Sequence, residues 1–124
     1  MRDKIVTANL SNGNLVKLTF LRENITLDVT EVKEGWEKAR KLSPEKKAMV
    51  LLKTGRWTLL EDDARRYVIR ELKTWPAVAI VVDNLGQRIM GQVVINLTGK
   101  RNQIKLFECE TKAAEWLKGK SSKN

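Results

Sequence analysis

The 124-residue sequence contains no histidine and only one cysteine. Without histidine the chain cannot form an imidazole general base, a Ser-His-Asp or Cys-His catalytic system, or a histidine metal site. The lone Cys109 can form neither an intramolecular disulfide nor a cysteine zinc cluster. These absences exclude much of hydrolase chemistry. We expect no catalytic activity, no cofactor and no bound metal.

Long apolar runs are missing as well. No segment approaches the roughly 20 apolar residues that cross a bilayer, and the opening residues MRDKIVTANLSNG have no apolar core typical of a signal peptide. We therefore expect no transmembrane segment and a cytoplasmic location. The 42% apolar content is enough for one hydrophobic core. We predict a single domain over residues 1–118 and a disordered basic tail over residues 119–124.

Acidic residues are outnumbered, which gives a formal net charge of +9. The basic excess is spread evenly, with 12 basic and 7 acidic residues in 1–60 and 12 and 8 in 61–124. Nucleic acid is therefore not the expected partner. If the sheet is parallel, however, its helix-to-strand loops share one edge, a basic rim that contains Lys41, Lys46, Lys47, Lys73, Lys100 and Arg101. Solvated loops are the favoured interpretation. Binding of an anionic membrane or nucleic acid is the alternative.

The order of elements predicts an α/β fold. Two apolar runs around Asn12-Gly13 indicate a β-hairpin in residues 4–21. An amphipathic helix follows in residues 25–42, and three strand-then-helix units come after it. We expect strands at 48–53, 77–83 and 104–108, and helices at 59–73, 85–97 and 111–118. This alternation predicts a mainly parallel sheet, extended by the hairpin and covered by about four helices.

The loop KTGRW, residues 53–57, follows the first of these parallel strands. Thr58 and Glu61 match a capping box, which would begin the next helix. The loop also lies at the carboxyl end of a strand, where α/β folds commonly bind ligands. A functional interpretation is an anion-binding or ligand-binding loop that uses Lys53, Gly55, Arg56 and Trp57.

The predicted helix at 85–97 is more apolar than a surface helix requires. Its apolar stripe consists of Leu85, Ile89, Val93 and Leu97, and Met90 and Val94 widen it. Core packing is the favoured interpretation. The alternative is that the outer edge of the helix buries a partner subunit or a lipid-like ligand.

Two segments carry a family resemblance that covers roughly residues 15–118. WPAVAIVVDNLGQRIMGQVVINLTG and IKLFECETKAAEWL resemble a small uncharacterised bacterial family related to STAS and Sec14-type domains. The resemblance implies a STAS-like fold. In STAS domains, including the anti-anti-sigma factors that bind a kinase, a phosphoacceptor hydroxyl lies at the start of the helix after a central strand. The matching residue is Thr58 or, as second choice, Thr54.

The leading hypothesis is a noncatalytic regulatory or protein-interaction module of STAS-like type. We expect a homodimer, with a kinase or another regulator as candidate partner. The second hypothesis is a carrier or sensor of a small apolar or anionic ligand, held between the 53–58 loop and the 85–97 helix. The third hypothesis is binding of an anionic membrane or nucleic acid through the basic rim.

Overall fold

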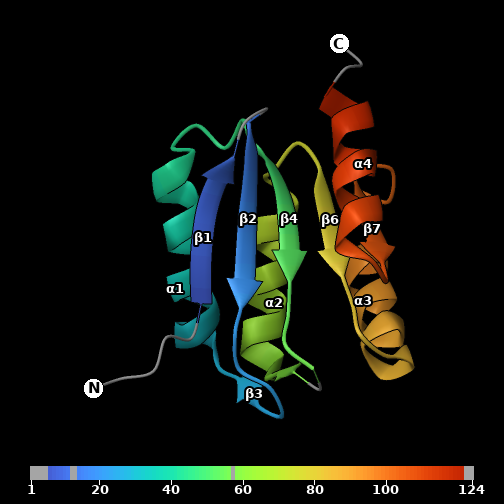
Figure 1. The fold of residues 1–124 in the computed structure, drawn as a ribbon. Helices are drawn as coiled ribbons and strands as arrows, with labels where there is room; N and C mark the ends of the chain where they lie inside the picture. Colours follow the sequence, from blue (N-terminus) through green and yellow to red (C-terminus); the bar gives the residue numbers. More distant parts are fainter. Residues whose placement is uncertain (1–5, 12–13, 57, 122–124) are drawn as a thin grey trace.

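The computed structural model describes residues 6–11, 14–56 and 58–121. Five strands form one sheet in the order β1-β2-β4-β6-β7 (Figure 1). The strands are β1 (Val6–Ser11), β2 (Leu15–Phe20), β4 (Met49–Lys53), β6 (Val78–Val81) and β7 (Ile104–Phe107). The helices are α1 (Val29–Leu42), α2 (Asp62–Leu72), α3 (Leu85–Thr98) and α4 (Glu110–Ser121).

The predicted hairpin and parallel sheet are both confirmed. β1 pairs antiparallel with β2, while β2, β4, β6 and β7 all pair in parallel. The Asn12-Gly13 turn between β1 and β2 lies outside the described residues. Because the last four strands of the sheet point the same way, all their carboxyl ends reach one edge.

Helices cover the two faces of the sheet unequally. Helices α1, α2 and α3 lie on one face, and α4 lies on the other (Figure 1). Alternate residues along each central strand serve the two faces. In β4, Val50 and Leu52 join the larger core beneath α1 and α2, and Leu51 joins the smaller core beneath α4.

Helix α1 shows how a local pattern and packing agree. Asp28 accepts a hydrogen bond from the Glu31 backbone, and the Glu31 side chain accepts one from the Asp28 backbone, which makes a complete capping box. Gly35, in the middle of the helix, is buried against β2. A Cβ on Gly35 would lie 2.7 Å from Cζ of Phe20, so this glycine lets the helix approach the sheet closely.

The predicted capping box at Thr58 is wrong. Helix α2 begins at Asp62, and Glu61 occupies the N-cap position without a side-chain hydrogen bond. Residues 59–60 instead form the short strand β5 (Leu59–Leu60), which pairs in parallel with β3 (Thr26–Leu27). This small second sheet takes up the residues that the pattern assigned to the first helical turn.

The predicted tail boundary is also wrong. Helix α4 continues to Ser121, so residues 119–121 are helical, whereas residues 122–124 lie outside the described residues. Lys120 explains the extra turn, because its Nζ donates to the Asn102 backbone oxygen at 2.7 Å and lies 5.2 Å from the ring centroid of Trp116. None of the helices that the structure describes is long and apolar enough to span a membrane.

Candidate functional site

A cleft opens at the edge of the sheet where the parallel strands end. Its volume is about 370 Å³. The lining residues come from the ends of four strands and the loops that follow them: Thr19, Phe20, Leu21, Glu23, Lys53, Thr54, Gly55, Arg56, Val81, Val82, Asp83, Glu108 and Glu110. The predicted ligand-binding loop therefore lines a cleft at the expected edge.

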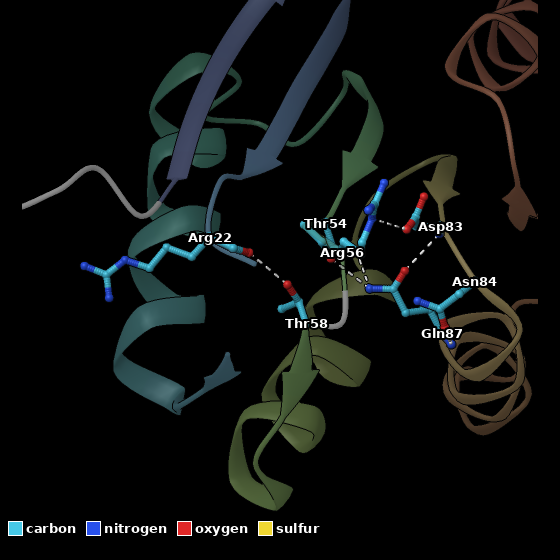
Figure 2. Close-up of polar contacts among 8 residues, drawn as sticks. Arg22, Thr54, Arg56, Thr58, Asp83, Asn84 and Gln87 are labelled. Carbon is cyan, nitrogen blue, oxygen red and sulfur yellow. Dashed lines mark hydrogen bonds and ion pairs between the residues drawn. The ribbon is translucent and has the colours of Figure 1, made fainter. Parts of the chain in front are cut away.

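Gln87 ties this loop to the start of α3. Its side-chain amide donates to the Gly55 backbone oxygen at 2.9 Å and to Thr54 Oγ1 at 3.4 Å, while its carbonyl accepts from the Asp83 backbone at 2.9 Å (Figure 2). Asn84 caps α3 by accepting from the Gln87 backbone at 2.9 Å. Because Gln87 is only 7% exposed, these contacts fix the 53–56 loop against the β6–α3 junction.

The same loop packs tightly against the segment that follows β2. A Cβ on Gly55 would lie 2.1 Å from the Arg22 backbone oxygen, so only glycine fits there. Thr58 donates its hydroxyl to that oxygen at 2.9 Å and is only 8% exposed (Figure 2). Thr54 is half-buried. A kinase could reach Thr58 only after this contact opens. The assignment of Thr58 or Thr54 as phosphoacceptor stays a prediction.

Both basic side chains that line the cleft are already paired with carboxylates. Lys53 Nζ lies 3.5 Å from Glu110, and Arg56 Nε lies 3.1 Å from Asp83. Lys17 binds the second oxygen of Glu110 at 2.6 Å, and this hydrogen bond lowers the pKa of that carboxyl group. An anion would have to compete with these carboxylates.

The lining as a whole is more acidic than basic. Its two cations are outnumbered by four acidic residues, Glu23, Asp83, Glu108 and Glu110. This local acidic excess contrasts with the net charge of +9 of the chain. Trp57 lies outside the described residues. Anion binding by Lys53, Gly55, Arg56 and Trp57 therefore stays a prediction. Among the described residues, no group of three or more acidic or cysteine side chains is placed to hold a metal ion.

The apolar stripe of α3 faces outwards except at Val94, so core packing, the favoured interpretation, is wrong for its other five residues. Five side chains form what we call the α3 face, with exposed fractions of 71% for Leu85, 57% for Ile89, 37% for Met90, 45% for Val93 and 60% for Leu97. The buried side of the helix is made instead by Gln87, Val94, Ile95 and Thr98. Helix α3 thus has two apolar sides, and only one of them meets the sheet.

A narrow apolar pocket lies between α2 and α3. Its volume is about 100 Å³, and its wall is largely aliphatic, with Thr54, Thr58 and Gln87 as polar members. The aliphatic lining comes from the sheet, from α2 and from α3: Leu52, Leu59, Leu60, Val68, Leu72, Ile80, Val82, Met90 and Val94. This places an apolar pocket between the 53–58 loop and the apolar helix, where the second hypothesis expected a ligand.

The basic rim gathers as the parallel topology requires, but two of its members are paired with acids. Lys46 Nζ lies 3.5 Å from the buried carboxylate of Glu71, and Lys47 Nζ lies 3.2 Å from Glu45. These pairs reduce the positive potential on that side. Binding of a membrane or nucleic acid there stays a prediction.

Sequence reasoning missed the residues that fix the loop. Asp83 and Asn84 lie between β6 and α3, and Gln87 lies in the first turn of α3. Asn84 before a helical pattern is a recognisable N-cap signal. The Arg22 backbone has no such signal, because its partner Thr58 is 36 positions away.

The chain matches a known protein family. Residues 10–121 match the family described as "Domain of unknown function (DUF7793)". The chain belongs to this family. A search of curated proteins finds no match.

A solved structure shares the fold. It is the crystal structure of an uncharacterized protein of the DUF3478 family, with a SpoIIAA-like fold, from Shewanella loihica PV-4. The TM-score is 0.64 at 16% sequence identity, and the match covers 94% of this chain and 98% of that chain. The predicted STAS-like fold is thereby confirmed for this member of the DUF7793 family. At this identity the likeness establishes the fold alone.

Proposed function

We propose that this chain is a noncatalytic regulatory module of STAS-like fold that acts by protein interaction through the α3 face. A second copy of the chain is the partner, so that the module works as a homodimer. The observation that carries this proposal is the outward stripe of five large apolar side chains on α3.

The size of the apolar stripe favours an interface. Of the eight large hydrophobic side chains that are exposed in the described residues, five lie on α3. Leu59, 53% exposed, adds to the same region, because it lines the α2–α3 pocket together with Met90. Burying apolar surface contributes about 25 cal/mol per Å². Continuous exposed patches of this kind mark interaction surfaces.

Charge favours a second copy as the partner. Two copies of a chain with net charge +9 repel each other, so they can best meet through a surface that carries little charge. Arg88 is the only charged residue of α3, and it pairs with Glu108. By contrast, α1 contains seven charged residues, α2 six and α4 five.

The spacing of the stripe suits a symmetric helix pair. Leu85, Ile89, Val93 and Leu97 follow one another every four residues, which forms a ridge inclined to the helix axis. Two such ridges pack antiparallel about a two-fold axis, with Ile89 of one copy beside Val93 of the other. One surface patch then serves both subunits.

Analytical ultracentrifugation of a charge variant tests this proposal. Ile89→Glu places a carboxylate at the centre of the α3 face. We expect the Kd of the dimer to rise at least about tenfold, because the interface would bury an unpaired charge. Leu10→Glu is the matched control, since Leu10 is 50% exposed on β1 and lies outside α3. That control should dimerise as the wild type does.

The same measurement separates the alternatives. Equal weakening by both variants, or a wild type that stays monomeric, would contradict a homodimer through α3. A monomer that instead binds lipid vesicles, with binding abolished by Ile89→Glu, would assign the α3 face to a membrane.

A second candidate function is favoured by the α2–α3 pocket. This function is the carriage or sensing of a small apolar ligand. The volume of the α2–α3 pocket, about 100 Å³, is below the roughly 300 Å³ of the smallest pockets that typically hold drug-sized ligands. A compact apolar group fits the pocket, and a longer ligand requires α3 to move outwards.

Native mass spectrometry of protein purified from cells tests the second candidate. We expect an adduct in the wild type and its loss in Val94→Phe, which would fill the pocket from its α3 side. Thermal melting shows that the variant is folded. An apo mass for the wild type, with no adduct after incubation with medium-chain fatty acids, would contradict this function.

A further inference from the structure

We propose that the edge strand β7, with the groove beside it, binds an extended acidic segment of another protein, which adds to the sheet as a further strand. The site lies at the end of the sheet opposite β1. It goes beyond self-association through the α3 face, because it recruits a different chain by a different chemistry.

The open edge of β7 supplies the backbone groups for this pairing. On the closed side, the Gln103 oxygen accepts from the Val78 backbone at 2.9 Å and the Phe107 oxygen accepts from the Val82 backbone at 2.8 Å. Because successive residues of a parallel strand point their backbone groups to opposite sides, Ile104 and Leu106 turn their N–H and C=O groups away from β6. Ile104 is only 2% exposed, so the accessible groups at this edge are those of Leu106. A strand added there would satisfy them.

A groove of about 590 Å³ runs between β7 and α3. Ile89 and Ile95 line it from α3, and Leu106 lines it from β7. Ile104 and Leu106 face the α1–α3 side of the sheet, where they join or contact the larger core. The side chains of an added strand that point to this side would therefore meet aliphatic carbon.

Charge defines the other side chains of the segment. The charged residues that line the groove are Arg88, Arg101 and Lys105, all of them basic. Arg88 is already paired with Glu108, so Arg101 and Lys105 supply the charge for a partner. Lys105 alternates with Ile104 and Leu106, so it projects from the opposite face of the strand. A partner segment that alternates apolar and acidic residues matches this arrangement, with carboxylates beside Lys105. The net charge of +9 steers such an acidic segment towards the protein.

Strand addition and charge attraction can be separated by a pair of peptides. We would use a fluorescein-labelled peptide of alternating glutamate and valine, about seven residues long, and follow its binding by fluorescence anisotropy. A second peptide carries the same residues with methylated backbone nitrogens, which removes its hydrogen-bond donors and keeps its charge. We expect the methylated peptide to bind at least about tenfold more weakly.

Two protein variants locate the site. Lys105→Glu should weaken peptide binding at least about fivefold, whereas Lys41→Glu, the same charge change on α1, should change it by less than about twofold. The groove shares Ile89 with the α3 face, so a segment bound there would compete in part with self-association. Lys105 lies outside the α3 face, so Lys105→Glu should dimerise normally, and the two proposals can fail separately. Equal binding of the methylated peptide, equal weakening by both variants, or no binding of the unmethylated peptide at about 1 mM would overturn the inference.

Discussion

The charged residues that line the carboxyl edge of the sheet on β4 and β6 are already paired with carboxylates or cations of the protein itself. Lys53 and Lys17 converge on Glu110, and Arg56 pairs with Asp83. The cations that made the 53–58 loop a candidate anion site are thus engaged with carboxylates. The loop therefore has a structural role, because its contacts connect the end of β4 to the segments that follow β2 and β6 and to α4.

The Glu110 carboxylate gives this edge a pH dependence. Its pKa is lowered in the folded chain by the hydrogen bond from Lys17, so folding favours the ionised form. The resulting stability is complete above the pKa of the unfolded chain, and it is lost as the pH falls through the lower pKa of the folded chain. Glu110→Gln should therefore flatten the decline of unfolding free energy below about pH 5.

Urea unfolding between neutral pH and about pH 3 measures this difference. The effect should stay below about 1 kcal/mol, since the side chain of Glu110 is 39% exposed to screening solvent. Glu115→Gln, on the same helix, is the control, and its decline should parallel that of the wild type. An identical decline in Glu110→Gln would remove the proposed role of the Lys17 contact.

Secondary-structure elements were predictable where local patterns decide them. β-Branched apolar runs predicted β4, β6 and β7, and the N-cap at Asn84 with the left-handed Gly99 after α3 confines that helix to residues 85–98. The start of α2 was not predictable. Thr58 matches a capping box, but its hydroxyl pairs with the distant Arg22 backbone, and a local pattern does not encode such a contact.

The orientation of α3 was the other element-scale failure. Periodicity identified the apolar residues of the helix, but it could not tell which of two apolar sides meets the sheet. Val94 and Ile95 pack inwards, and the stripe around Ile89 remains outside. The exposed side chains were therefore named from the sequence as a candidate interaction surface, which stays a prediction, while the preference for core packing came from assuming that one apolar stripe suffices.

Gln87 connects α3 to the 53–56 loop, and its removal should destabilise both. Gln87→Ala leaves the Gly55 oxygen and the Asp83 amide without their partner, which should lower the unfolding free energy by about 2–4 kcal/mol. Gln92→Ala is the matched control, because Gln92 is exposed on the same helix. It should change stability by less than about 0.5 kcal/mol. Similar urea midpoints for the two variants would contradict the anchoring role.

At the scale of the whole molecule, the chain combines high positive charge with one helix that is almost uncharged. Added salt screens repulsion between copies over a Debye length of about 10 Å at 0.1 M. Dimerisation through α3 should therefore tighten as salt rises. Binding to nucleic acid or to an anionic membrane through the basic rim would weaken under the same change.

Sedimentation equilibrium of the wild-type chain at low and moderate salt is the most direct test of the α3 interface. We predict a monomer–dimer equilibrium in which moderate salt lowers the Kd. A monomer at every concentration and both salt conditions would contradict it, as would a dimer that salt dissociates.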